Sequence, residues 1–228
     1  MFLSRRATQE EYFDSERPTW EVAEFFRSLN RVNRFFDFAE PFRNLVPKLV
    51  HQGNCRSLSI LDLGAGDGFL GRTVKDWAAK RGWNWQIVNL DSSLAALSLN
   101  PGGHNIAGSA IRLPFVDSSF DVVIASQMAH HLGDGEVKLM LQESWRVARQ
   151  ALLLCDLHRN VALYLLLAFL LRLQSHPASF RADALLSVKR AWRVGDLARL
   201  AAEAGVSAAS VKLYFGARVI LTARKERL

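Results

Sequence analysis

Glycines recur at every second position between Gly64 and Gly68, directly after a short apolar segment. The whole stretch reads Ile60-Leu61-Asp62-Leu63-Gly64-Ala65-Gly66-Asp67-Gly68. Glycine permits a tight turn and lets the backbone approach a ligand closely. A strand that leads into such a turn, and then into a helix, places the turn at the carboxyl edge of an α/β sheet, where ligands bind. The spacing therefore predicts a loop that holds a cofactor.

Two kinds of cofactor place different demands on this loop. Dinucleotide-binding loops follow G-x-G-x-x-G, whereas here the third glycine comes two positions after the second and Phe69 stands where that pattern requires glycine. Asp62 lies inside the predicted strand, where a pyrophosphate has no need of a negative charge. A carboxylate does attract an ammonium group in a partly dry site. S-adenosylmethionine carries an ammonium and a sulfonium, so the loop favours this cofactor over a dinucleotide.

The stretch from Asp62 to Gly68 resembles motif I of the class I S-adenosylmethionine-dependent methyltransferases. Later segments are similar to that family in the same order: Asp91 at the end of the next strand, residues 108–115 with 119–123, and the loop at 125–132. The resemblance extends over roughly residues 57–156, and it is closest to the small-molecule enzymes related to ubiquinone biosynthesis.

The resemblance implies a set of contacts to S-adenosylmethionine, which would leave as S-adenosylhomocysteine. Asp91 is expected to bind the ribose hydroxyls, with a helix cap for Ser92 onward as the alternative. Ser109 stands where the family usually has an acidic residue that binds the adenine amino group, and Ala110 offers its backbone N–H to the ring. The expected cofactor-binding residues are Asp62, Gly64, Ala65, Gly66, Gly68, Asp91, Ser92, Ser109, Ala110, Ser126 and Gln127.

Histidines supply the candidates for a base. The stretch from His130 to Asp134 resembles the H-x-apolar-x-D segment of plant-type small-molecule O-methyltransferases, whose first histidine is the catalytic base. A base assists a hydroxyl acceptor by taking its proton, and histidine does this near neutral pH. We expect His130 as base, with a structural role as the alternative, His131 in the acceptor site, and His158 as the reserve base. No cluster has metal-ligand spacing, so we expect no metal.

Strands that alternate with helices must position these groups. We predict strands at 57–63, 85–90, 106–107, 120–125 and 151–156, and helices at 69–80, 92–99, 136–149, 161–173 and 194–204. Such alternation predicts a mostly parallel sheet with helices on both faces. Residues 211–215 and 218–223 predict a closing antiparallel hairpin. The expected fold is a Rossmann-like, seven-stranded α/β sheet.

The first fifty residues form a separate unit in the sequence. Apolar residues follow helical spacing across 19–49, and two prolines interrupt them, which predicts two or three short helices. We expect residues 1–50 to be a lid that recognises the acceptor through Phe35 and Phe36; a packing layer or a dimer interface is the alternative. Residues 51–228 would be the methyltransferase domain, with a polar insertion at 175–193.

Charge and composition limit the partners. The net charge is +7, but the arginines are scattered and form no nucleic-acid-binding motif, and residues 126–129 lack the Pro-Pro motif of base N-methyltransferases, which disfavours nucleic acid. Two distant cysteines and no apolar leader indicate the cytoplasm. The apolar run 161–171 is too short to cross a bilayer, yet it allows peripheral membrane contact. A monomer and a homodimer both remain open.

We therefore expect methyl transfer to a small apolar or aromatic acceptor, most simply at the hydroxyl of a polyketide-like, phenolic or quinone-like compound of secondary metabolism. Two alternatives stay open at this stage. One is N- or C-methylation of a lipid, quinone or nucleic acid. The other is a non-catalytic module that binds the cofactor or a partner.

Overall fold

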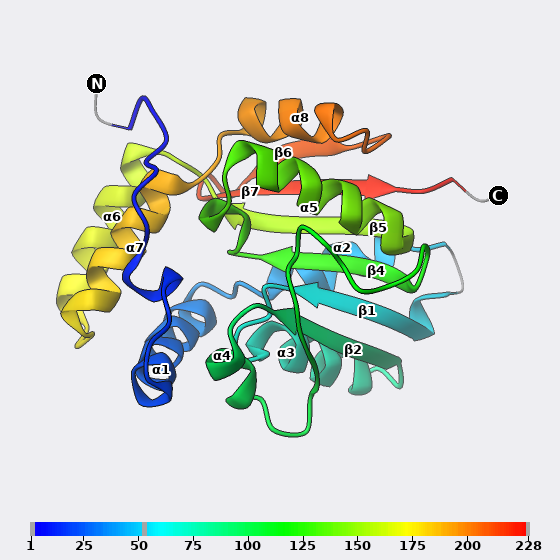
Figure 1. Cartoon of the computed structure of the whole chain (residues 1–228), viewed down its shortest axis with the longest axis horizontal. Helices are drawn as coiled ribbons and strands as arrows, with labels where there is room; N and C mark the ends of the chain where they lie inside the picture. Colours follow the sequence, from blue (N-terminus) through cyan, green and yellow to red (C-terminus); the bar gives the residue numbers. More distant parts are fainter. Residues whose placement is uncertain (1–2, 52–53, 227–228) are drawn as a thin grey trace.

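A single seven-stranded sheet forms the centre of the computed structural model, which describes residues 3–51 and 54–226 (Figure 1). Its order is β3-β2-β1-β4-β5-β7-β6. The first five strands are parallel, and β7 runs antiparallel to both of its neighbours, as predicted. The strands are β1 Ser57–Leu63, β2 Asn84–Asp91, β3 His104–Ala107, β4 Phe120–Ser126, β5 Ala148–Leu157, β6 Ser210–Tyr214 and β7 Arg218–Arg224.

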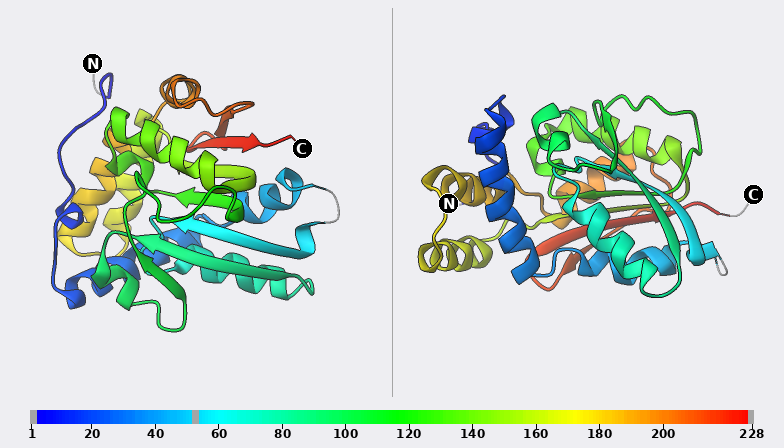
Figure 2. Two further views of the ribbon diagram at one scale, coloured as in Figure 1. Left: turned by 45° about the vertical axis from the view of Figure 1, so that its right-hand side comes forward. Right: turned by 90° about the horizontal axis from the view of Figure 1, so that it is seen from below.

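Helices cover both faces of the sheet (Figure 2). One core cluster joins α2 and α3 to one face, and another joins α5 and α8 to the opposite face. The helices are α1 Thr19–Phe35, α2 Glu40–Leu49, α3 Phe69–Ala79, α4 Leu94–Ser98, α5 Asp134–Val147, α6 Val161–Leu173, α7 Ala178–Arg190 and α8 Val194–Glu203, with short 3-10 turns η1 Tyr12–Asp14, η2 Asn54–Arg56 and η3 Ala129–His131.

The apolar strands follow from this double covering. In β1, Ile60 packs toward α2 and α3, whereas Leu61 packs toward α5 and α8, and both are fully buried. A strand that is buried on both faces reads as a nearly continuous apolar run, which is why β1 and β5 could be predicted from composition.

The order of the strands changes direction beside β1. The chain passes from β3 at one edge of the sheet back to β4, on the other side of β1. In open α/β sheets, ligands bind at the carboxyl ends of the strands at such a point. Here α1, α6 and α7 form a third layer over these strand ends, and they share their own apolar cluster (Figure 1).

Helix α7 lies within the segment 175–193, for which we predicted a polar interruption without a helix. Its buried side includes Asp183, Ser187 and Arg190, so an apolar stripe is weak. The carboxylate of Asp183 accepts hydrogen bonds from the backbone of Tyr12 and Phe13. The inward face of α7 is therefore polar because it binds the N-terminal segment.

Among the described residues, no helix combines the length and apolar character needed to span a bilayer.

Candidate active site

A cavity of about 960 Å³ lies between the carboxyl edge of the sheet and the layer of α1, α6 and α7. This volume is at the upper end of the range for sites that bind small molecules. One end is formed by the glycine loop and the ends of β2 and β4. The other end is mainly apolar and includes Phe25, Phe26, Leu29, Phe36, Phe38, Leu163, Leu167 and Phe180.

The glycine loop needs glycine for two separate reasons. Gly64, Gly66 and Gly68 have φ angles of +64°, +56° and +72°, in the left-handed region that other residues rarely adopt. Space is also limited, because a Cβ on Gly66 would lie 2.5 Å from the ring of Phe26 on α1. A Cβ on Gly64 would lie 2.6 Å from Met128, in the loop after β4. The glycine loop is thus packed directly against α1.

Asp62 is a buried carboxylate with one unpartnered oxygen. Its side chain is 1% exposed and lines the cavity, and its Oδ2 has no hydrogen-bond partner among the described residues. Burial, together with the negative charge of Asp91, raises the pKa of Asp62 to about 8. A cationic group in the cavity would supply the positive charge that stabilises the ionised form of this carboxylate. The ammonium of S-adenosylmethionine fits this requirement.

Asp91 joins the glycine loop to the start of α4. Its Oδ2 accepts a hydrogen bond from Gly66 N at 2.8 Å, and its Oδ1 accepts one from Ser93 N at 2.8 Å. The N-cap of α4 is Ser93, whose Oγ accepts a hydrogen bond from Ala96 N at 3.2 Å, so Asp91 supports the turn before the helix. A carboxylate oxygen can accept more than one hydrogen bond. Asp91 also lines the cavity, so ribose binding remains a prediction that this geometry permits.

Most of the other expected cofactor contacts also line the cavity, including Ala65, Ser92, Ala110 and Ser126. Gly68 does not line it; this glycine begins α3 and packs against Asn100. The remaining two side chains, Ser109 and Gln127, each have a hydrogen-bond partner. Ser109 Oγ accepts a weak hydrogen bond from Ile111 N at 3.4 Å, and Gln127 Nε2 donates to Asn33 Oδ1 on α1 at 2.9 Å.

His130 is buried in the η3 turn, and Asp156 at the end of β5 holds it. Its Nδ1 lies 2.7 Å from Asp156 Oδ1, and its backbone N–H donates to Asp156 Oδ2 at 3.0 Å. Burial opposes the ionisation of Asp156. The pKa of Asp156 is nevertheless lowered, because His130 interacts with it electrostatically and through a hydrogen bond. An ionised Asp156 accepts a hydrogen bond from Nδ1–H, so in the neutral form of the ring Nε2 carries the lone pair. This nitrogen belongs to a side chain that lines the cavity.

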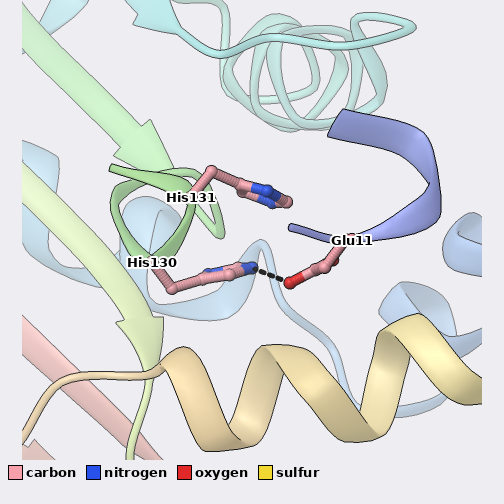
Figure 3. Close-up of side chains that lie close together, drawn as sticks. All are labelled: Glu11, His130 and His131. Carbon is pink, nitrogen blue, oxygen red and sulfur yellow. Dashed lines mark ion pairs between the residues drawn. The ribbon is translucent and has the colours of Figure 1, made fainter. Parts of the chain in front are cut away.

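Glu11 faces His130 from the N-terminal segment, a contact that the sequence did not indicate (Figure 3). Glu11 Oε1 lies 3.7 Å from His130 Nε2 and accepts a hydrogen bond from Ser187 Oγ at 2.9 Å. Burial raises the pKa of Glu11 to about 7, against the lowering effects of His131, Ser187 and Arg190. A proton that leaves an acceptor at this place would therefore meet Glu11, whose pKa lies near 7, beside the ring of His130.

Glu11, His130 and His131 each offer a ligand atom, and these atoms lie within 4.8 Å of one another (Figure 3). Two imidazoles and a carboxylate also form a ligand set that binds transition metals. A positive charge is already beside this group, because Arg190 Nη1 lies 3.8 Å from Glu11 Oε1. We did not expect this grouping, since no local spacing in the sequence reveals it.

Two arginines fix the N-terminal segment beside this site. Arg6 Nη2 donates to the carbonyls of His130 at 2.7 Å and Leu132 at 2.6 Å. Arg190 Nη2 donates to the His131 carbonyl at 2.7 Å and its Nη1 binds Asp14. Asp14 also lies 2.5 Å from His131 Nδ1. Residues 6–14 thus form a strap across α7 and the loop after β4 (Figure 1).

Two of the expected site residues lie elsewhere. His158 ends outside the cavity wall, where its Nδ1 lies 3.1 Å from Asn160 Nδ2, and burial lowers its pKa. Phe35 is 65% exposed, whereas Phe36 lines the cavity. Neighbouring residues of a helix project about 100° apart, so only one of these two rings can face the cavity. Of the other expected acceptor contacts, His131 does line it.

Comparisons with known proteins agree with this arrangement. A family model described as a methyltransferase domain matches residues 61–154. No curated protein matches the chain significantly. Among solved structures, an S-adenosylmethionine-dependent methyltransferase from Aquifex aeolicus is 14% identical, with a TM-score of 0.63 over 92% of this chain and 99% of that chain.

Two further structures have the same fold. Human N-acetylserotonin methyltransferase in complex with S-adenosylmethionine is 15% identical, with a TM-score of 0.63 over 92% of this chain and 57% of that chain. Magnesium protoporphyrin IX methyltransferase from Synechocystis, with bound S-adenosylhomocysteine, is 17% identical, with a TM-score of 0.57 over 86% of this chain and 85% of that chain.

Proposed function

We propose that this chain, a class I S-adenosylmethionine-dependent methyltransferase, methylates a hydroxyl of a small apolar or aromatic acceptor, with His130 as the base. One observation carries the proposal. The carboxylate of Asp62, whose Oδ2 has no hydrogen-bond partner among the described residues, and the side chain of His130, which Asp156 holds, line the same cavity, so a cationic cofactor and a base would meet there.

The residues of the chain divide the work as follows. When bound, the cofactor supplies an activated methyl group on its sulfonium. The glycine loop and Asp91 would hold it, and Asp62 would bind its ammonium. His130 Nε2 would accept the hydroxyl proton as the acceptor oxygen attacks the methyl carbon in line with the carbon–sulfur bond. Much of the acceleration of such a displacement comes from holding the reacting atoms in line.

Asp156 and Glu11 would both stabilise the imidazolium that this step forms. Asp156 contacts Nδ1, and Glu11 lies on the side of Nε2. An ionised carboxylate near a developing positive charge lowers its energy in a buried site. The role proposed for Glu11 is therefore that of a positioning residue on the strap.

The acceptor class follows from the opposite end of the cavity. Phenylalanine and leucine side chains from α1 and α6, together with Phe180 of α7, form a large part of that wall, beside polar groups of α7 and of the N-terminal segment. A flat or extended apolar molecule would displace water from these rings, whereas a strongly polar acceptor would lose its hydration without replacement. We therefore assign residues 1–50 the role of an acceptor-recognising lid, together with α6 and α7.

The test uses cell extract, labelled S-adenosylmethionine and purified protein, followed by mass spectrometry of the labelled product. We expect a methyl ether, formed by the parent protein and lost by a factor of about 10² or more in His130→Ala. Cofactor affinity, measured by calorimetry, should be unchanged in that variant. Full turnover by His130→Ala, or a product methylated on nitrogen or carbon, would contradict the proposal.

A further inference from the structure

Helix α6 exposes a continuous apolar stripe to solvent. Val161, Leu165, Phe169 and Leu173 follow one another at intervals of four residues, so they lie on one face of the helix. Their exposed fractions are 44%, 60%, 60% and 68%. The stripe is roughly 18 Å long, because a helix rises about 1.5 Å for each residue.

This exposure is unusual for such a helix. Residues 161–171 contain only one polar group, the hydroxyl of Tyr164, and helices that are apolar on all sides are normally buried. The other side of α6 is indeed buried, through Leu167 and Leu171, against α1 and α7. The outer side faces away from the sheet at one end of the molecule (Figures 1 and 2).

A further aromatic side chain extends the stripe at the start of α6. Asn160 Nδ2, in the residue that caps this helix, donates to the Gly216 carbonyl in the turn between β6 and β7 at 3.0 Å. Phe215, the preceding residue of that turn, is 85% exposed. The turn therefore brings a second exposed apolar group to the same end of the molecule.

Positive charge surrounds the opposite end of the stripe. Arg172 and Arg181 are exposed, and Arg31 Nη1 donates to the Ser175 carbonyl, which follows α6. The charges of Arg31 and Arg181 both reach His176 between α6 and α7, whose pKa is lowered first by burial and then by these two guanidinium groups. Residues 161–190 contain four lysine and arginine side chains, of which Arg190 is buried beside His130, and a single acidic one, Asp183, which is also buried. Glu21 and Glu24 of α1 lie beside Pro177, at the start of α7.

The same helix forms part of the cavity wall. Leu163, Leu166 and Leu167 line the cavity, whereas Leu165 and Phe169 do not. One helix thus separates the predicted acceptor site from an apolar surface. A bilayer on this surface would therefore lie next to the apolar end of the cavity.

We infer that the α6 stripe docks on the surface of an anionic membrane, and that the acceptor enters the cavity from the lipid phase. An apolar face with arginines beside it binds at the boundary between headgroups and acyl chains without crossing the bilayer. The charge complementarity favours this partner over a second copy of the chain, whose arginines would face each other. The second part of the inference, on the acceptor, rests on the proposed function.

Vesicle flotation tests the docking surface without any turnover. The probes are vesicles of phosphatidylcholine alone and vesicles with phosphatidylglycerol added. We expect binding to the anionic vesicles that weakens with salt. Leu165→Glu/Phe169→Glu should bind at least about tenfold less, because two buried apolar contacts become charges. Arg172→Gln/Arg181→Gln should lose about fivefold for each arginine on anionic vesicles.

The matched control is Val116→Glu/Leu139→Glu, which places the same charges at two exposed apolar residues on another face of the molecule. It should bind vesicles like the parent. Equal vesicle binding by the parent and by Leu165→Glu/Phe169→Glu would overturn the inference. So would a parent dimer that ignores vesicles and becomes a monomer in this variant by light scattering.

The acceptor arm separates the two proposals. Vesicles made from the cell's own lipid extract, incubated with labelled S-adenosylmethionine, should yield a labelled product that stays in the organic phase. A water-soluble product would overturn the lipid-phase acceptor and leave the proposed methyl transfer intact. Absence of transfer with normal vesicle flotation would overturn the proposed function and leave the docking surface.

Discussion

The Nδ1 atom of His130 lies 2.7 Å from Oδ1 of Asp156, a carboxylate with no solvent exposure. The other oxygen of Asp156 accepts the backbone N–H of His130, so a single carboxylate fixes both the ring and the turn that carries it. Asp156 lies at the carboxyl end of β5, and His130 lies in the η3 turn that follows β4, the neighbouring strand of the sheet. The orientation of the predicted base is thus set by the sheet itself.

Asp156→Asn should lower turnover by a factor of about 10² to 10⁴. The amide can donate a hydrogen bond to Nδ1, which favours the tautomer with its proton on Nε2 and removes the base. Affinity for S-adenosylmethionine, measured by calorimetry, should stay near the parent value. Asp134→Asn, which removes an exposed carboxylate from α5, serves as the control. Unchanged turnover in Asp156→Asn would show that Asp156 has no role in the reaction.

Asp62→Asn should stabilise the cofactor-free protein and weaken cofactor binding. The folded pKa of Asp62 is raised from 3.8 to about 8, so stability is greatest below the lower value and falls as pH rises through the upper one. The variant should lack that fall, and gain a few kcal/mol above pH 8. Urea unfolding below pH 5 and above pH 8 measures this gain. Calorimetry should show a loss of cofactor affinity of about tenfold or more.

Gly66→Ala should lower the stability of the protein through two effects that a control can separate. The residue has a φ of +56°, and the new Cβ would lie 2.5 Å from the ring of Phe26. Gly82→Ala shares the conformational cost, with a φ of +71°, but nothing lies within 4 Å of its Cβ. Thermal unfolding should show a loss of about 1 kcal/mol in Gly82→Ala and more in Gly66→Ala. Equal losses would mean that Phe26 moves aside freely.

Release of the strap should depend on pH through Glu11. The folded pKa of Glu11 is raised from 4.5 to about 7, so docking is strongest at low pH and weakens as pH rises through 7. The amides of Tyr12 and Phe13 report docking, because both donate to Asp183. Their hydrogen-exchange protection factors should fall between about pH 5.5 and pH 8.5.

Glu11→Gln serves as the matched variant for this measurement, because glutamine keeps the size of the side chain but does not titrate. Its protection factors should change less with pH than those of the parent. His131 and Asp14 face the same site and remain in both proteins. An identical pH profile in the variant would assign the change to this second pair.

The sheet and the cofactor loop could be predicted because their signals are local. The strand Ser57–Leu63 and the helix Val161–Leu173 have the predicted bounds, since a buried strand or helix shows an apolar run that ends at a turn residue. Other strands differ at their ends. Strand β5 begins three residues before the predicted position, because Ala148 already pairs with Phe120 at the start of β4.

The features that could not be predicted from the sequence are those that depend on contacts between residues far apart in the chain. Helix α7 carries polar residues on its buried side for binding the strap, so no apolar periodicity reveals it. The pairing of Asp14 with His131 joins residues 117 positions apart, and Glu11 reaches His130 in the same way. The error on Phe35 has a simpler origin, because composition identified an aromatic pair but not the helical face on which each ring lies.

The strap also has a consequence for how the protein is made. The hydrogen bond from Arg6 to Arg190 connects residues that are 184 positions apart. A ribosome adds the first of these long before the second, and contacts between such distant segments form slowly because a long loop must close. The nascent chain can pair its five parallel strands, β1 to β5, before α7, which binds the first residues, has been made. The site around His130 is therefore closed only after α7 has left the ribosome, and until then the emerging protein holds an open, unfinished active site.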